Sequence, residues 1–391
     1  MSSQATRTSN KFQEVTKGLK KITAHSIDSS QVHIENSIGS VQVPVGLAGP
    51  LLVREIGKAG EQKGEEVYAP LATTEAALIA SCSRGCKVFS RSGGVYITSL
   101  SDTMSRTPAF KFNSPTDALL FAEQIPTFHG ELKRVAESTS RHLRLLSVTP
   151  TVVGSETHLK FNYACGDAAG QNMATIATHR ACREMLLDPA VAQLLKVRGF
   201  LIEAGLSADK KGSWSHLMEP RGVEVMAWGA ITNEAAREVL GCTSEAMYQG
   251  LCQLQSTNIR AGVHGNSINA MNIVTALFIA TGQDVASIAE ACWNQLVPEY
   301  NNETKVITLS LYIPSLPVAV VGGGTHLGPQ REALELMNCS GPGKKGRLAA
   351  LIAAFALALE VSTAGALHTD TFTQAHKVLR RKPVGDTNAK L

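Results

Sequence analysis

The stretch His264–Asp284, "HGNSINAMNIVTALFIATGQD", joins an amide-rich start, a long apolar run and a carboxylate end. Asn266, Ser267 and Asn269 stand where a helix should begin, because such side chains can accept the free backbone N–H groups there. Asn272 has no such explanation, since it lies inside the apolar run. A buried amide without a partner costs about 1–3 kcal/mol, so Asn272 is either a satisfied core amide or a ligand contact.

The far end of this run carries Gly282 and then Asp284. Glycine is typical of a helix end, because it adopts the left-handed conformation without a steric penalty. A helix of about twelve residues spans about 18 Å, which is too far for Asn272 and Asp284 to hold one small group of atoms. We therefore expect them to line opposite ends of a long site.

The composition indicates a globular protein of ordinary balance, with 391 residues, 44% hydrophobic and 18% charged. This length predicts two or three domains. The formal net charge is only +4, and basic and aromatic residues do not interleave, so nucleic-acid binding is not expected. The 8 cysteines lack the second Cys or His pair of a zinc site, which favours reduced thiols and no metal.

The ends of the chain bear on its location. The polar start "MSSQATRTSNKF" has no apolar signal-peptide core. The longest apolar run, Leu348–Leu359, is shorter than the roughly 20 residues that cross a bilayer, so it predicts a buried helix and no membrane span is expected. The ending Ala389-Lys390-Leu391 is similar to the Ser-Lys-Leu peroxisomal signal. It predicts a peroxisomal protein, or otherwise a cytosolic one.

Hydrophobic periodicity predicts an α+β protein. Ile38–Val53 reads as strands separated by Gly and Pro, and Ala72–Ser90 as a helix capped by threonines. From about Thr149, two short strands, a helix and a strand suggest a small α/β unit inserted into a larger domain. The other predicted elements are a strand at 95–100, a helix within 116–146, a strand at 222–231, helices at 233–250 and 267–281, strands within 305–321 and helices at 347–367 and 369–381.

Two charged segments are candidates for chemistry. Glu75 stands in the apolar "LATTEAALIAS"; it is either a capping-box glutamate or a half-buried carboxyl. In the second case desolvation favours its protonated form, which could donate a proton near neutral pH. Asp209, Lys210 and Lys211 follow a predicted strand in "SADKKGS". They form either a solvated turn or part of a site.

Two glycine-containing segments are candidates for ligand contact. "GDAAGQNM" (Gly166–Met173) opens a predicted helix, whose N-terminus could receive a phosphate or a carboxamide. "GGGTHLGPQ" (Gly322–Gln330) follows a predicted strand, and its glycines permit close approach of the backbone to a ligand. It lacks the Gly-x-Gly-x-x-Gly spacing of a dinucleotide fingerprint, so neither motif alone identifies a ligand.

Taken in order, these motifs resemble the catalytic portion of class I hydroxymethylglutaryl-coenzyme A (HMG-CoA) reductase. The resemblance runs from about residue 28 to residue 376. The motif "VGLAGP" is similar to that of the eukaryotic class rather than the bacterial one. The chain as a whole resembles a diverged paralogue of that class. The matching segments are "ENSIGSVQVPVGLAGPL", "LATTEAALIAS", "GDAAGQNM", "DKK", "NIVTALFIATGQD" and "GGGTHLGPQ".

The resemblance implies an NADPH-dependent four-electron reduction of an acyl-CoA thioester to an alcohol, with mevalonate and CoA as products. It also implies self-association as a dimer or tetramer, with active sites at the dimer interface. The implied architecture is a large mixed domain around a central helix, with a small inserted ferredoxin-like nucleotide-binding domain. The implied ranges are an N-terminal helical segment at 1–27, a large substrate and CoA domain at 28–142 and 202–368, an NADP(H) domain at 143–201 and a C-terminal helix and tail at 369–391.

The resemblance also assigns roles to residues. Lys210 would stabilise the carbonyl oxyanion, Glu75 would donate a proton, Asp284 would join their hydrogen-bond network, and His376 would protonate the departing CoA thiolate. The implied acyl contacts are Arg141, Asp209, Lys211 and Asn272. The implied CoA contacts are Glu35, Asn36, Ser81 and Arg84. The implied nicotinamide-nucleotide contacts are Asp167, Gly170, Asn172, Met173, Gly322, Gly323, Gly324 and Thr325.

Several positions depart from the family pattern. Tyr163 and Ala164 replace a Ser-Arg pair that grasps the 2′-phosphate of NADPH, and the lost charge-assisted contact is worth about 1.5–3 kcal/mol. NADH is therefore possible as well as NADPH. Glu203 places a carboxylate near an anionic acyl group. Arg260 is the candidate for a missing lysine, and Asn269 replaces a histidine.

These departures keep alternatives open. Tyr163, Ala164 and Glu203 would suit a hydrolase, lyase or dehydratase that processes CoA thioesters on the same scaffold without a nicotinamide cofactor. A third possibility is a non-catalytic binding subunit. The presence of all four implied catalytic residues argues against it.

Overall fold

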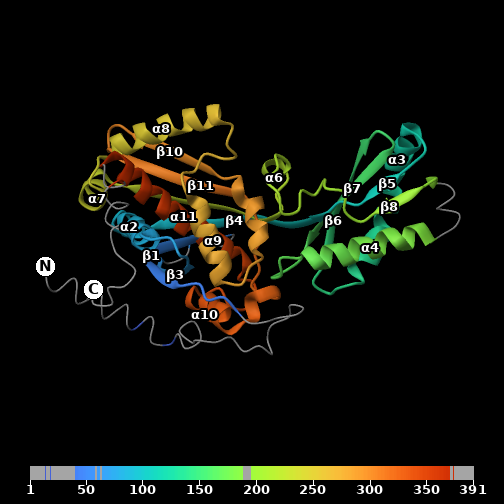
Figure 1. Ribbon diagram of the computed structural model, residues 1–391, viewed down its shortest axis with the longest axis horizontal. Helices are drawn as coiled ribbons and strands as arrows, with labels where there is room; N and C mark the ends of the chain where they lie inside the picture. Colours follow the sequence, from blue (N-terminus) through green and yellow to red (C-terminus); the bar gives the residue numbers. More distant parts are fainter. Residues whose placement is uncertain are drawn as a thin grey trace.

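The strand β4 (Val95–Arg106) passes from the larger lobe into the smaller one and belongs to both (Figure 1). It pairs with β9 (Gly222–Ile231) in the larger lobe, and its last residues, Met104–Arg106, pair with β7 (Glu156–Ala164) in the smaller one. The computed structural model describes residues 40–57, 60–61, 64–187 and 195–369, with Glu14, Gly18 and Thr373. These residues have the mixed α and β fold expected from the sequence.

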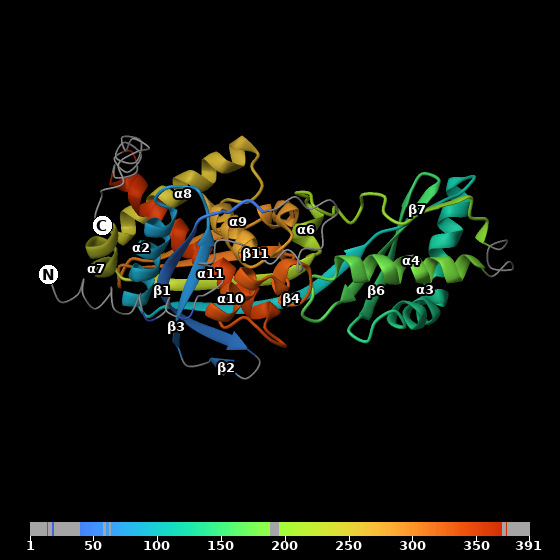
Figure 2. The same ribbon diagram turned by 60° about the horizontal axis from the view of Figure 1, so that its bottom comes forward.

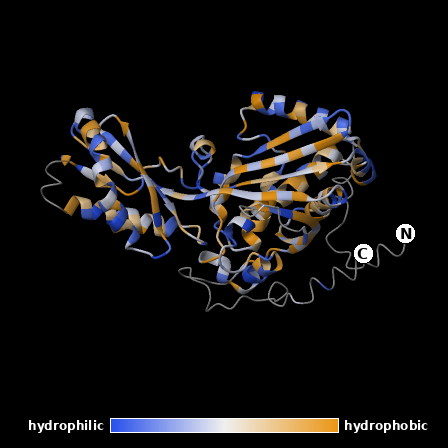
Figure 3. Ribbon diagram, turned by 180° about the vertical axis from the view of Figure 1, so that it is seen from behind, coloured by the Kyte–Doolittle hydropathy of each residue, from blue (hydrophilic) through white to orange (hydrophobic). Residues whose placement is uncertain are grey.

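The larger lobe is built on a sheet that is packed on one face by helices. Its other strands are β1 (Val45–Gly57), β2 (Gly60–Glu61), β3 (Glu65–Ala72), β10 (Gln295–Asn301) and β11 (Val306–Leu316). The main order is β3-β1-β4-β9-β11-β10, antiparallel except between β1 and β4. Buried and partly exposed residues alternate along β9 and β11, and Figure 3 shows this as hydrophobic and hydrophilic bands.

Helix α11 (Lys345–His368) forms the centre of the larger lobe, in contact with the sheet and with other helices (Figures 1 and 2). Every residue from Arg347 to Ala366 is buried, and each fully buried Leu, Ile or Phe side chain contributes about 1.5–3 kcal/mol. Its apolar stretch is long enough to cross a membrane but is wholly enclosed by the protein. The buried helix predicted around Leu348–Leu359 is confirmed.

The other helical segments outside the smaller lobe are short or cover the surface of the core. They are α2 (Leu78–Arg91), α6 (Ser215–Met218), α7 (Asn233–Ala235), η2 (Ala236–Leu240), α8 (Ser244–Ala261), α9 (Ala270–Ala280), η3 (Val285–Cys292), η4 (Gly323–His326) and α10 (Gly328–Leu336). Helices α2 and α9 both contact α11, so the apolar run of α9 packs in the core.

The smaller lobe has a sheet and a core of its own. Its remaining elements are β5 (Ala109–Lys111), α3 (Pro115–Glu137), β6 (Arg144–Val153), α4 (Gln171–Leu187) and β8 (Gly199–Leu201). The strands lie in the order β8-β5-β7-β6, and neighbours are antiparallel. Along the chain the lobe therefore reads β-α-β-β-α-β. The strand-strand-helix-strand order predicted from about Thr149 is confirmed, with the first strand starting at Arg144.

Helix α2 begins later than the sequence predicted. The N–H of Thr73 donates to the carbonyl oxygen of Pro44 at 2.9 Å, which continues the β1–β3 pairing beyond Ala72. Ala77 then adopts the left-handed conformation (φ 70) just before the helix starts at Leu78. The predicted start at Ala72 and the predicted threonine cap are wrong, and Glu75 lies in the turn that precedes the helix.

Helix α3 ends earlier than predicted, at Glu137 rather than near residue 146. The hydroxyl groups of Ser138 and Thr139 bind the carbonyl oxygens of the last turn and stop the helix.

Helix α3 and β5 pack into the core of the smaller lobe, although both precede the boundary at residue 143 that the sequence suggested. The domain ranges stay predictions, and strand β10 was not predicted at all.

We expect Gly85→Ala to destabilise the larger lobe. A Cβ atom at Gly85 of α2 would overlap the backbone carbonyl oxygen of Ala358 in α11, and overpacking of a core typically costs about 1–3 kcal/mol. Urea denaturation followed by far-ultraviolet circular dichroism measures the effect. The matched control is Gly130→Ala in α3, where a Cβ atom would have no neighbour within 4 Å; it should be neutral or stabilise by up to about 1 kcal/mol. Equal midpoints for both variants would contradict this reading.

Candidate active site

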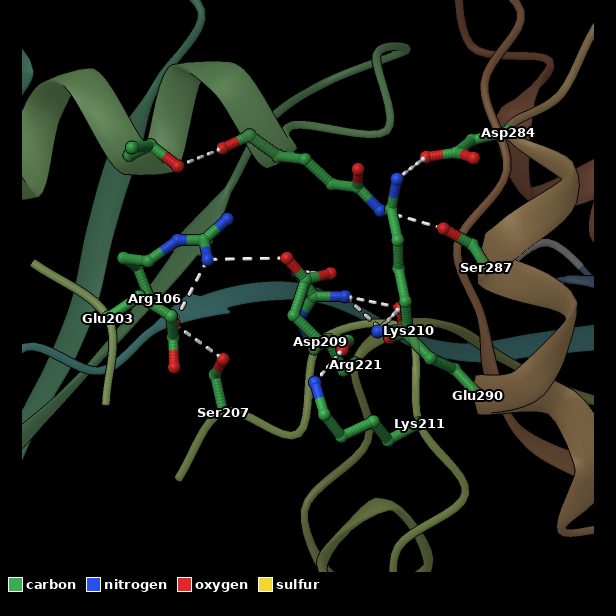
Figure 4. A network of polar contacts seen from close by, with 12 residues as sticks. Arg106, Glu203, Ser207, Asp209, Lys210, Lys211, Arg221, Asp284, Ser287 and Glu290 are labelled. Carbon is green, nitrogen blue, oxygen red and sulfur yellow. Dashed lines mark hydrogen bonds and ion pairs between the residues drawn. The ribbon is translucent and has the colours of Figure 1, made fainter. Parts of the chain in front are cut away.

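Lys210 and Asp284 form an ion pair at the junction of the two lobes (Figure 4), with 2.8 Å between Nζ and Oδ2. Asp284 is the N-cap of η3, and its other oxygen accepts the N–H of Ala286 at 3.2 Å. That bond fixes the carboxylate and leaves Oδ2 free for the ammonium. Both side chains remain partly exposed, at 43% and 39%, so the ammonium can still reach a bound ligand.

Glu75 and Asn272 form a second pair. The Nδ2 of Asn272, in the first turn of α9, donates to an oxygen of Glu75 at 2.7 Å. Asn272 is half-buried and Glu75 is exposed. The half-buried carboxyl expected at Glu75 is therefore wrong for the single chain, because the turn before α2 holds it at the surface. The amide of Asn272 is satisfied by this carboxylate rather than by the core.

Helix α9 separates the two pairs. From Asn272 to Ala280 it rises by about 12 Å, so Asn272 and Asp284 lie at opposite ends of it, as expected. Among the described residues, no hydrogen bond or ion pair joins Glu75 to Lys210 or Asp284. The convergence of these three groups that the resemblance implied is not made within one chain.

The two candidate nucleotide loops lie next to each other. The N–H of Val320, just before the Gly322–Thr325 segment, donates to the carbonyl oxygen of Asp167 at 2.9 Å. Gly324 packs backbone against backbone on Gly282, which places the glycine-rich loop at the end of α9. Gly170 adopts φ 91 at the start of α4. The structure therefore brings both loops to the end of α9 that carries Asp284.

The residues of these loops fit a dinucleotide. The first N–H groups of α4, a helix of 17 residues, have no partner within the helix and attract anionic groups. The backbone of Gly322 and Gly323 is exposed and carries no side chain that would obstruct a ligand. Asn172 is exposed and Met173 half-buried beside them. These features suit the phosphates and the amide of a nicotinamide nucleotide.

A chain of charged side chains lies behind the loop that carries Lys210 (Figure 4). Arg106 donates to Glu203 at 3.0 Å and to Asp209 at 3.3 Å. Arg221 lies 3.0 Å from Asp209 and donates to both oxygens of Glu290, at 2.7 and 2.5 Å. Arg221 is 1% exposed and Glu290 0%. Three carboxylates thus share two guanidinium groups, which leaves one negative charge near the ammonium.

The sequence analysis missed Arg106, Arg221 and Glu290. Glu290 stands alone among small apolar residues in "ASIAEAC", which is the pattern that singled out Glu75, so this signal was present. The two arginines flank strands and carry no comparable signal. Arg106 lies 97 and 103 positions from Glu203 and Asp209, and Arg221 lies 69 positions from Glu290, so only the fold reveals these pairs.

The comparison with known proteins agrees with these motifs. A family model described as "Hydroxymethylglutaryl-coenzyme A reductase" matches residues 4–381. The chain belongs to the HMG-CoA reductase family. The 3-hydroxy-3-methylglutaryl-coenzyme A reductase of Methanothermobacter thermautotrophicus is 37% identical over 97% of this chain and 94% of that protein. The enzyme of Methanocaldococcus jannaschii is 35% identical over 96% of this chain and 93% of that protein.

Solved structures of the family share the fold. The class II HMG-CoA reductase of Streptococcus pneumoniae, described as bound to NADPH in open conformations, has a TM-score of 0.70. The two chains are 19% identical, and the match covers 97% of that chain and 94% of this one. The identity is nearly twice as high with the archaeal enzymes, in agreement with the predicted class I form. The predicted family is confirmed.

The other residues that the family resemblance assigned to the substrate have structural partners here. Asp209 lies between Arg106 and Arg221, so its carboxylate belongs to the charged chain. The ammonium of Lys211 donates to the carbonyl oxygen of Asp209 at 3.0 Å and remains exposed. Arg141 lies in the turn before β6 in the smaller lobe and donates to the neighbouring His142. The acyl-binding roles of these residues stay predictions.

The residues assigned to CoA lie partly in α2. Ser81 shares a hydrogen bond with Ser362 of α11 at 2.9 Å, and Arg84 donates to the hydroxyl and carbonyl oxygens of Ser362 at 2.9 and 2.8 Å. Their polar groups therefore hold α2 against α11. The remaining assigned residues, with the C-terminal tripeptide that predicted a peroxisomal location, lie outside the described residues: Glu35, Asn36, His376, Ala389, Lys390 and Leu391.

The departures from the family pattern also find partners. Tyr163 points into the core of the smaller lobe and its hydroxyl bonds that of Thr178 at 2.8 Å. Glu203 is neutralised by Arg106 and accepts the hydroxyl of Ser207 at 2.7 Å. Arg260 is exposed at the end of α8, and no contact of the described residues connects it to Lys210. Ala164 also leaves a charge of the family pattern unreplaced at its own position.

The start of α9 depends on a buried carboxylate, Glu360 of α11. Its two oxygens accept the N–H groups of Ile268 and Asn269, each at 2.6 Å. The side chain of Asn269 does not cap the helix but donates to Thr363, so the capping role expected for it is wrong. Glu360 thus supports the turn from which Asn272 reaches Glu75.

We expect the contribution of Glu360 to stability to fall with rising pH. Burial raises the pKa of Glu360 from 4.5 to about 7, against the opposing effect of the three N–H groups at the start of α9. Because the folded protein holds the proton more tightly than the unfolded chain, this contribution is present below about pH 4.5 and is lost as the pH rises through about 7. The free energy of unfolding of the natural protein, less that of Glu360→Gln, should fall by about 1–3 kcal/mol between pH 5 and pH 8.

Urea titrations at several pH values measure this difference. Subtracting the free energy of unfolding of Glu360→Gln cancels the contributions of the other titrating groups to the pH dependence. One of these is the buried His216, whose pKa burial lowers to about 4. A difference that stays flat or rises over this range would contradict the assignment.

Proposed function

We propose that this family member reduces hydroxymethylglutaryl-CoA to mevalonate and CoA, consuming two NAD(P)H and two protons. The observation that carries the proposal is the Lys210–Asp284 ion pair, which lies where the two candidate nucleotide loops meet the end of α9. A fixed cation at the position where negative charge develops is often the largest single catalytic effect. Relatives of nearly full length that bear this enzyme's name support the substrate.

In the first reduction, a hydride adds to the thioester carbon and the carbonyl oxygen becomes anionic. The ammonium of Lys210 stabilises this oxyanion, and Asp284 holds the ammonium in place. The hemithioacetal then loses CoA as a thiolate to give an aldehyde, and a second hydride reduces the aldehyde to the alcohol. NAD(P)H supplies the hydride of both reductions when it is bound.

Two protons complete the reaction. Glu75 delivers the proton to the carbonyl oxygen, and the amide of Asn272 orients its carboxyl group through the 2.7 Å hydrogen bond. The departing thiolate takes its proton from His376, a role that rests on the family resemblance.

A second copy of the chain would complete this site in a dimer or a larger assembly. In the single chain Glu75 is exposed and contacts neither Lys210 nor Asp284. A second copy that brings the acid of one subunit to the ammonium of the other joins the two groups. It also excludes water, which strengthens every charge interaction in the site.

The smaller lobe is proposed as the nucleotide-binding domain. Its β-α-β-β-α-β order with neighbouring antiparallel strands is that of ferredoxin-like units, and α4 offers its N-terminus to the ligand. Ala164, at the end of β7, leaves no cation at the position that holds the 2′-phosphate in the family. NADPH remains the proposed cofactor because the family resemblance implies it. The missing cation should make NADH more readily accepted than the family pattern implies.

The contacts of Tyr163 and Glu203 give little support to the alternative function as a hydrolase, lyase or dehydratase. Tyr163 is a core residue, and Glu203 is paired with Arg106. Two of the three substitutions that motivated this alternative are thus explained by packing and pairing, and Ala164 bears on cofactor selectivity.

Lys210→Ala should abolish the reduction of hydroxymethylglutaryl-CoA rather than raise its KM alone. The ammonium acts on charge that exists only in the transition state, so kcat should fall by about 100-fold or more. Steady-state oxidation of NADPH and of NADH measures the rate. Sedimentation velocity on both proteins gives the oligomeric state and excludes dissociation as the cause. Unchanged kcat in the variant, or no turnover by the natural protein with either nucleotide, would end the proposal.

Ala164→Arg should shift the cofactor preference toward NADPH. Restoring a charge-assisted contact worth about 1.5–3 kcal/mol should raise the ratio of kcat/KM for NADPH over NADH by about tenfold or more. Calorimetric titration with each nucleotide gives the corresponding change in Kd without turnover. Ala164→Gln is the uncharged control of similar length. An equal shift in the Gln variant would show that charge is not the cause.

A further inference from the structure

The backbone at Lys210 is held in an unfavourable conformation. Lys210 has φ 57 and Ala208 has φ 52, and each left-handed residue other than glycine costs about 1–2 kcal/mol. Such a turn persists only where its surroundings hold it in place. The surrounding group that meets the peptide of Lys210 is Glu290, whose Oε1 accepts its N–H at 3.0 Å.

Glu290 is itself immobilised. It has no exposed surface, and two hydrogen bonds tie its carboxylate to Arg221. The same guanidinium group lies 3.0 Å from the carboxylate of Asp209, the residue before Lys210. One buried arginine therefore holds two consecutive residues of the loop, one directly and one through Glu290.

The segment η3 contacts Lys210 through one residue near each end of η3. Asp284, at the start of η3, binds the ammonium, and Glu290, near its end, binds the backbone N–H. Between them, Ser287 accepts a hydrogen bond from Gln171, the first residue of α4, at 2.9 Å (Figure 4). The short helix thus fixes the Lys210 side chain relative to the candidate nucleotide loops.

We propose that Glu290, held by Arg221, is a positioning residue that sets the Lys210 loop for reduction of the thioester. This inference rests on the proposed reductase function. Replacing a buried ion pair by apolar groups is often neutral or stabilising, so the pair is not needed for stability alone. Its specific consequence is the position of Lys210, and a displacement of about 1 Å in a catalytic group can cost about 100-fold in rate.

The test compares Glu290→Gln with a matched control, Glu55→Gln. Each change removes one of two carboxylates around a buried arginine, since Arg221 keeps Asp209 and Arg347 keeps Glu65. Only the first contacts the Lys210 loop. We expect Glu290→Gln to lower kcat about tenfold or more with KM changed less than about threefold, and Glu55→Gln to leave both within about twofold.

A second series separates positioning from general damage. Gln keeps one oxygen for the N–H of Lys210, whereas Glu290→Leu removes both, so the loss of kcat should be larger in the Leu variant. Thermal unfolding of all variants identifies any that do not fold. If kcat falls equally in Glu290→Gln and Glu55→Gln, or falls only in proportion to thermal stability, the positioning role is overturned.

A measurement without turnover keeps this test distinct from that of the function itself. Reductive 13C-methylation labels the lysines, and Lys210→Arg identifies the signal of Lys210. Its chemical shift should move in Glu290→Gln and stay in place in Glu55→Gln. A natural protein that reduces no acyl-CoA would refute the proposed function but leave this readout intact. An unshifted Lys210 signal in folded Glu290→Gln would refute the positioning role.

Discussion

One buried ion pair determines the geometry of this site. Removing a carboxylate and a guanidinium group from water costs several kcal/mol for each ion, and their mutual attraction offsets this only in good geometry with further hydrogen bonds. Arg221 and Glu290 must therefore stay in contact wherever the fold is intact. Their charged groups also contact Asp209 and the N–H of Lys210. The peptide of Lys210 is thus held by buried charges that lie next to its loop.

The same charges tie together the two lobes. Arg106 is the last residue of β4, at the point where the strand passes from the larger sheet to the smaller one. It holds Glu203, which follows β8, against Asp209 in the next loop. The bond from Gln171 to Ser287 makes a second tie across the junction. The loop that returns from the smaller lobe is therefore anchored at both sides before it presents its ammonium group.

The sequence predicted what depends on local pattern and on the ordered motifs: the family, the hairpin of β6 and β7, the buried α11 and the proximity of Lys210 to Asp284. It failed where a distant group decides the outcome. The start of α2 depends on a backbone bond from Thr73 to Pro44 of the neighbouring strand, and the start of α9 on a carboxylate in α11. Glu290 is a lone carboxylate in apolar sequence but was not singled out, and its partner Arg221 is 69 positions away. Roles that rest on residues outside the described ranges, or on a second subunit, could come only from the resemblance.

The two halves of the candidate site depend on different kinds of group, which explains where the chain can depart from its family. The nucleotide side offers backbone N–H groups at the start of α4 and glycines without side chains. Such a surface keeps its shape when a neighbouring side chain changes, so the substitution at Ala164 leaves the loop in place. The reducing side depends on named side chains joined in series. A new carboxylate there, at Glu203, is tolerated because Arg106 neutralises it; without that partner it would repel the carboxylate of Asp209 and so disturb the loop that carries Lys210.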